Sequence, residues 1–77
     1  MHPAEKRLID VYEEEARQWD GVAKDIDWLI QQVVEAKGKE YGAVLAGRYR
    51  SHASDLRGMA ETVRTWVKSK PGDHGIA

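Results

Sequence analysis

Residues 9–33, IDVYEEEARQWDGVAKDIDWLIQQV, decide the fold that the sequence predicts. Apolar residues recur along this stretch at alternating steps of three and four positions. They are Ile9, Tyr12, Ala16, Trp19, Ala23, Ile26, Ile30 and Val33. This spacing places one apolar stripe along a helix and is typical of a coiled-coil seam.

A second stretch with the same spacing follows in the C-terminal half. Its members are Leu45, Tyr49, His52, Leu56, Met59, Val63 and Trp66, and only His52 is polar. Strands require a sustained period of two, which does not occur in this chain. The sequence therefore predicts an all-α protein with two long helices.

Proline and glycine set the expected boundaries. Pro3 suits the first turn of a helix, where its missing N–H costs nothing. Gly38, behind Lys37, suits the position just after a helix end, and Pro71 stops the second helix. We expect a single helical-hairpin domain over residues 1–77, with helices over about 4–37 and 40–69 and a flexible tail over 70–77.

Trp19-Asp20-Gly21 offers an alternative boundary inside the first helix. The tripeptide resembles the W-x-G turn of a family of small secreted helical hairpins, in which the turn lies between equal arms near mid-chain. Here the seam passes from Trp19 to Ala23 without a change of phase, and an interior glycine costs a helix only about 1 kcal/mol. We expect a continuous helix, either straight or kinked at Gly21.

A short connection near Gly38 and Lys39 makes the helices antiparallel neighbours. Facing residues in such a hairpin have numbers that add up to a constant. The predicted layers are Val33/Leu45, Ile30/Tyr49, Ile26/His52, Ala23/Leu56, Trp19/Met59, Ala16/Val63 and Tyr12/Trp66.

The two predicted helices carry opposite charge. Residues 4–37 hold nine acids and five bases, net −4, and residues 39–70 hold seven bases and three acids, net +4. Acids and arginines form two rows with members seven positions apart. These are Glu13, Asp20 and Asp27 in one row, and Arg50, Arg57 and Arg64 in the other. We expect the rows to form ion pairs along one edge and to fix the antiparallel register.

The opposite edge is apolar or weakly polar, and two helices cannot cover it. We expect this edge and the outward Trp28 to form a partner or dimer interface. Its residues are Leu8, Val11, Val22, Trp28, Leu29, Tyr41 and Val44. Two hairpins pairing there make a homodimeric four-helix bundle, and a monomeric hairpin with a wide apolar stripe is the alternative.

Catalytic and metal-binding patterns are missing from the sequence. The three histidines are scattered, and cysteine is absent. His52 is interpreted as a polar seam residue that fixes register, and a pH-sensitive or partner-sensing role is the alternative. We expect no catalytic residue, cofactor or metal.

These features predict a small non-enzymatic protein-interaction module, an adaptor or inhibitor that binds another protein. Small helical proteins of phages and mobile elements often act in this way. A net charge of −1, no apolar run near 20 residues and no secretory leader predict a cytoplasmic protein without a membrane partner.

A nucleic-acid role is the alternative function. The segment Leu45-Ala46-Gly47-Arg48-Tyr49-Arg50 resembles helical segments in small terminase subunits of actinobacterial phages. The resemblance covers six residues and implies an oligomerisation module associated with nucleic acid. The contact residues would be Arg50, Arg57, Arg64, Lys68 and Lys70.

Overall fold

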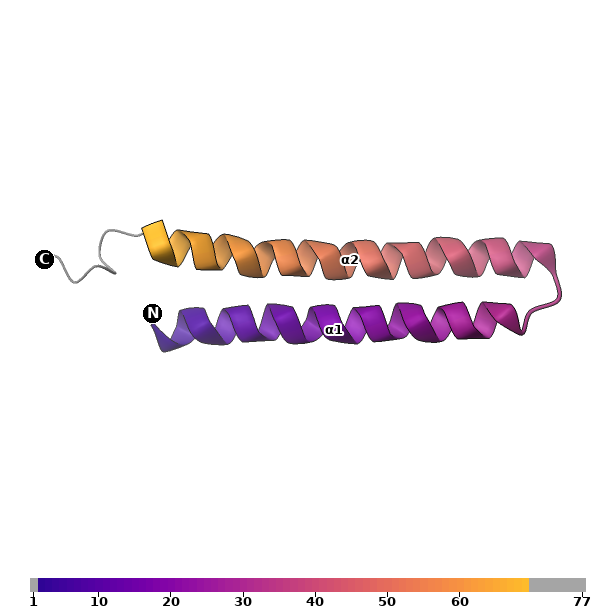
Figure 1. The fold of residues 1–77 in the computed structure, drawn as a ribbon, viewed down its shortest axis with the longest axis horizontal. Coiled ribbons are helices and arrows are strands. Elements are labelled where there is room, and N and C mark those ends of the chain that lie inside the picture. The colour runs from indigo at the N-terminus through magenta and orange to yellow at the C-terminus, as the bar shows by residue number, and fades with distance from the viewer. Residues whose placement is uncertain (1, 70–77) are drawn as a thin grey trace, which may run out of the picture.

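The computed structural model describes residues 2–69, and they form an antiparallel pair of helices (Figure 1). Helix α1 spans Pro3–Gln31 and helix α2 spans Ala36–Ser69. No strand occurs within the described part, so the predicted all-α hairpin is confirmed. The expected tail over residues 70–77 lies outside the described residues.

The N-terminus of α1 is closed by a capping box. The His2 ring accepts a hydrogen bond from the backbone N–H of Ala4 at 3.0 Å, while the His2 N–H donates to the Glu5 carboxylate at 3.1 Å. Pro3 occupies the first helical turn, where no N–H is needed. These contacts satisfy backbone groups that a helix start otherwise leaves open.

Helix α1 runs through Gly21 without interruption, as the unbroken seam predicts. Its end differs from the prediction. The helix stops at Gln31 rather than near residue 37, and α2 begins at Ala36 rather than near residue 40. The connection therefore covers residues 32–35, and Val34 in it is 94% exposed.

Gly38 lies inside α2 instead of ending α1, and the reason is close helix approach. A Cβ atom at Gly38 would lie 2.7 Å from Cγ1 of Val33. At Gly42, one turn further, it would overlap Cγ2 of Ile30 and lie 3.2 Å from the Ile30 Cβ. Both glycines let the start of α2 pass close to residues 30–33. From the sequence alone, a glycine that permits such contact cannot be told from a glycine that ends a helix.

The buried stripe of α2 lies one position away from the predicted seam. Tyr49, Leu56 and Val63 face α1 as expected, with Leu56 buried and the other two half-buried. The residues between them are the small ones, Gly42, Ala46, Ala53, Ala60 and Val67, which are all buried. The larger residues expected there, His52, Met59 and Trp66, are exposed, so their placement in the seam was wrong.

Alanine dominates the interior of the hairpin. The buried apolar residues of the described chain are Ile9, Ala16, Ala23, Ala46, Ala53, Leu56, Ala60 and Val67, and all five alanines are fully buried. Small residues allow two helix backbones to approach closely, but each one removes little apolar surface from water. The interior is therefore thin.

The facing layers are shifted by about one heptad from the predicted ones. Ile30 lies against Gly42 rather than Tyr49, and Val33 lies against Gly38 rather than Leu45. The Trp19 ring stacks on Tyr49, with centroids 5.0 Å apart, instead of facing Met59. The shift follows from the connection, which lies several residues earlier in the chain than expected.

Neither helix combines the length and the apolar character that crossing a bilayer would demand, as judged over residues 2–69.

Candidate interaction surface

One edge of the hairpin is closed by ion pairs, and we call it the paired edge. Arg50 binds Asp27, Arg57 binds Asp20, and Arg64 binds Glu13. All three pairs join α2 to α1 and match the predicted rows, which confirms the predicted pairing but not the predicted layers. Their side chains are between one third and one half exposed, so each pair contributes only about 0–1 kcal/mol.

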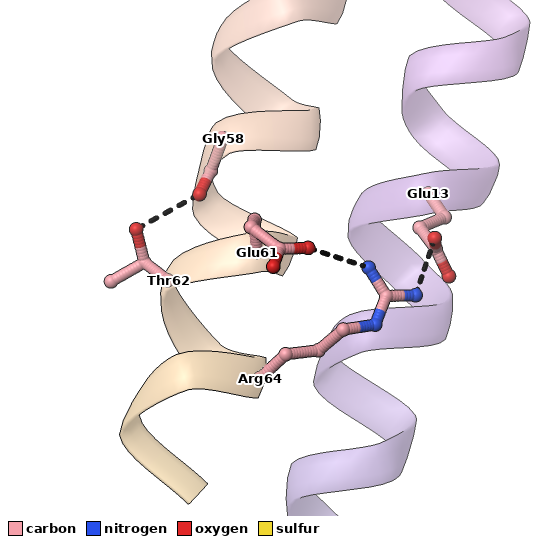
Figure 2. A network of polar contacts seen from close by, with 5 residues as sticks. All are labelled: Glu13, Gly58, Glu61, Thr62 and Arg64. Carbon is pink, nitrogen blue, oxygen red and sulfur yellow. Dashed lines mark hydrogen bonds and ion pairs between the residues drawn. The ribbon is translucent and has the colours of Figure 1, made fainter. Parts of the chain in front are cut away.

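The end of the paired edge is drawn in Figure 2. Arg64 Nη2 donates to a Glu13 carboxylate oxygen at 2.5 Å, and Arg64 Nη1 lies 3.5 Å from Glu61 Oε2 one turn away. The hydrogen bond to Glu13 is the main cause that raises the pKa of Arg64. Thr62 donates its hydroxyl to the Gly58 carbonyl at 2.9 Å and takes no part in the pairing.

The ion pairs form although the facing layers differ from the predicted ones. Side chains on a helix lean toward its N-terminus, which for α2 is the connection end. Arg50 therefore reaches along the hairpin to Asp27, an acid that lies nearer the connection than the α1 residues directly opposite. A long arginine tolerates an axial offset that packed apolar side chains do not.

The pairing bears on the nucleic-acid alternative. Arg50, Arg57 and Arg64 each hold an acid of the same chain, so their charges are already balanced. Lys68 is exposed, and Lys70 lies outside the described residues. The structure thus supplies no cluster of unbalanced arginines along α2 for a phosphate backbone.

The other side of the hairpin, which we call the open edge, carries apolar residues without a covering element. It consists of Leu8, Val22 and Leu29 of α1 and Leu45, Met59 and Trp66 of α2, flanked by Val11 and Tyr41 and interrupted by the exposed Glu15 and His52. Nine large apolar residues of the described chain are exposed, and six of them belong to this edge. The paired edge has none of the nine.

Met59 and Trp66 were missed as surface residues by the sequence reasoning, and so was the half-buried Leu45. They share the 4-3 spacing of a seam and are larger than the alanines beside them. The arginine row indicates which stripe of α2 is buried, the one with Met59 and Trp66 or the one with the alanines. With Met59 and Trp66 in the seam, the arginines would lie about 130° from its centre, and with the alanines inside they lie at about 77°, where they flank it.

The predicted interface residues fall into two groups in the structure. Leu8, Val11, Leu29 and Tyr41 are exposed along the open edge, and Val22 is half-buried there. Trp28, 61% exposed, and Val44, 57% exposed, lie instead on the outward surfaces of α1 and α2 near the connection. The predicted residues therefore do not form one surface.

His52 lies beside the seam instead of within it. Its ring is exposed and meets the edge of the Trp19 ring, with centroids 5.4 Å apart and planes at 73°. Together with the stack of Trp19 on Tyr49, this makes a small aromatic cluster at the middle of the hairpin. A register-fixing role for a buried histidine does not fit an exposed one.

Residues 2–69 contain no group of three or more histidine, aspartate or glutamate side chains arranged to hold a metal ion. No family model matches the chain, and neither a curated protein nor a solved structure shows significant similarity to it. The residues of the two edges and the outward surfaces are therefore the basis of the functional argument.

Proposed function

We propose that this protein is a small non-enzymatic interaction module that forms a homodimer through the open edge and binds another protein as an adaptor or inhibitor. The observation that carries the proposal is the contrast between edges. Six of the nine exposed large apolar residues of the described chain gather on the edge that lacks ion pairs. Exposed apolar side chains gathered on one side of a small protein are typical of protein interfaces.

The thin interior supports self-association. A hairpin whose buried residues are mostly alanine removes little apolar surface from water, and chains below about 80 residues rarely gain more than 3–5 kcal/mol from one core. The chain has no cysteine with which to form a disulfide. Covering Leu29, Met59 and Trp66 with a second copy would supply the missing burial in an isologous four-helix bundle.

Sedimentation equilibrium of purified variants tests the homodimer. We expect Leu29→Lys to raise the dimer dissociation constant at least 100-fold, because the lost burial of about 1.5–3 kcal/mol counts twice in an isologous interface. Ala43→Lys is the matched control. Ala43 is exposed and precedes Arg50 by seven positions in the row of the paired edge, so this variant should remain dimeric. A wild-type chain that sediments as an 8.7 kDa monomer at micromolar concentration would refute the homodimer.

The second protein is proposed to bind around Trp28, on the outward surface of α1 near the connection. Trp28 and Val44 remain exposed outside the open edge, and an exposed tryptophan is a frequent anchor of protein interfaces. An affinity purification from the native host should retain one protein in stoichiometric amount with wild type and with Gln31→Ala, a neighbouring exposed position. Trp28→Ala should lose it. Equal retention by both variants would remove Trp28 from the proposal.

A further inference from the structure

Charged residues flank the open edge, among them Asp25 of α1 and Arg48 of α2. Resting on the self-association proposed above, we propose that both connections lie at the same end of the dimer, with α1 of each copy against α2 of the other. Asp25 of one copy then faces Arg48 of the second copy, and the contact occurs twice. The second copy of this chain is thus the occupant of the open edge.

Two face-to-face arrangements keep every neighbouring helix antiparallel. In the first, the twofold axis runs along the helices, the connections share one end, and α1 meets the second copy's α2. In the second, the axis runs across the helices, the connections lie at opposite ends, and each helix meets its own equivalent. The apolar residues of the open edge are covered in both, so apolar burial does not choose between them.

The charge of whole helices favours the first arrangement. The described α1 holds eight acids and four bases, net −4, and α2 holds seven bases and three acids, net +4. The first arrangement places each acidic helix between two basic ones. The second places the two acidic helices side by side, and the two basic helices likewise, where like charges repel across the interface.

Individual side chains beside the open edge point to the same choice. The contacts of Ile30 with Gly42 and of Val33 with Gly38 set Asp25 level with α2 residues within one turn of Arg48. Both Asp25 and Arg48 are exposed, and neither belongs to an ion pair within residues 2–69. An axis along the helices preserves level, so it brings Asp25 opposite Arg48 of the second copy.

In the second arrangement, Arg48 and Asp55 do not face residues of opposite charge. With the two open edges fully overlapped, its axis crosses the hairpin near the level of Asp55. Asp55 would then face its own equivalent, and Arg48 would face the uncharged Thr62. The Asp25–Arg48 match therefore occurs only in the first arrangement, which sets Glu15 near the level of Asp55 of the second copy, whereas the second arrangement sets Asp55 against its own equivalent. The opposite net charges of the two helices favour the first arrangement as a whole.

Charge exchange tests the contact by its effect on the dimer dissociation constant. We expect Asp25→Arg and Arg48→Asp each to raise it about tenfold at low salt, because each creates two like-charge contacts per dimer. The double variant should return to within about threefold of wild type. Asp10→Arg makes the same charge change outside the open edge and should alter the constant less than threefold. A double variant as weak as the combined singles would overturn the contact.

Distances between single labels test the orientation directly, since the chain has no native cysteine. One variant carries a spin label at Val34→Cys, in the connection. A separate variant carries it at Ala4→Cys, at the far end of the hairpin. Both positions are exposed. We expect the two copies' labels to lie below about 25 Å in each dimer, from helix spacings of about 10 Å.

Opposite connections would separate the labels by more than about 35 Å, from the helical rise of about 1.5 Å per residue. A dimer formed by exchange of α2 between open chains would give a short distance at Val34 and a long one at Ala4. A long distance at either position overturns the orientation while leaving self-association intact. A monomer in the same samples overturns both proposals.

Discussion

The two edges of this hairpin are built from the same heptad spacing and carry opposite chemistry. Along the paired edge each charged side chain finds its partner within the chain, as Arg57 does with Asp20. Along the open edge, Leu29, Met59 and Trp66 stay exposed. The paired edge joins the two helices of the hairpin to each other, whereas the open edge is the one proposed to bind a second copy. The predictions below disturb this division, from the largest expected effect to the smallest.

The contrast between edges depends on the small residues that keep the seam where it is. Gly42→Ala should destabilise the hairpin by about 1–3 kcal/mol, because the added Cβ overlaps the stiff, branched side chain of Ile30. Thermal unfolding followed by circular dichroism measures the change at fixed protein concentration.

Gly47→Ala is the control for that variant. Gly47 lies in the same helix with nothing within 4 Å of an added Cβ, so alanine should stabilise the helix by about 0.5–1 kcal/mol. Adding Ile30→Leu to Gly42→Ala removes the obstructing methyl group and should recover part of the loss. Equal unfolding temperatures for the two glycine variants would contradict the close approach at Gly42.

The paired edge should respond to charge reversal by a smaller amount. Arg57→Glu places a second acid beside Asp20 and should cost about 1 kcal/mol at low salt, less in 1 M salt because the pair is half-exposed. The exchange Asp20→Arg with Arg57→Glu should restore most of the stability, which chemical denaturation would show. A double variant no better than the single one would mean that the pair does not act as a unit.

The smallest effect is expected at the exposed pair within α1. A hydrogen bond from Arg17 lowers the pKa of Glu14. The favourable contact is therefore complete above the ordinary pKa of glutamate and is lost as the pH falls through the lowered value. In Arg17→Gln, the carboxyl titration of Glu14 followed by NMR should move up toward the ordinary range. An unchanged titration would show that Arg17 is not the cause.

Much of the fold was predictable because spacing along a helix is a strong constraint. The two helices, continuity through Gly21 and the three ion pairs between them all followed from residues seven positions apart. The ion pairs did not fix the axial register, however, because an arginine reaches a partner more than one turn away from its own level. Correct charge pairing therefore coexisted with layers that were wrong by a heptad.

The surface was predictable only in part because two stripes of α2 share the same spacing. Ranking by size placed Met59 and Trp66 inside, but the close approach at Gly42 leaves room only for residues such as Ala53 and Ala60. In the same way, Gly38 was interpreted as a helix end, because the sequence does not distinguish a glycine that permits close contact from one that ends a helix. Tertiary packing decides between these meanings.

The exposed connection has a consequence for how the molecule can be taken apart. Val34 is almost fully exposed, and residues 32–35 join two helices of opposite net charge whose ion pairs with each other lie further along the hairpin. Cutting the chain after Val34 would leave peptides of 34 and 43 residues, each of which holds one helix with its half of the ion pairs and of the buried stripe. The hairpin is in this sense a pre-linked heterodimer, and its halves would serve as a fragment-complementation pair.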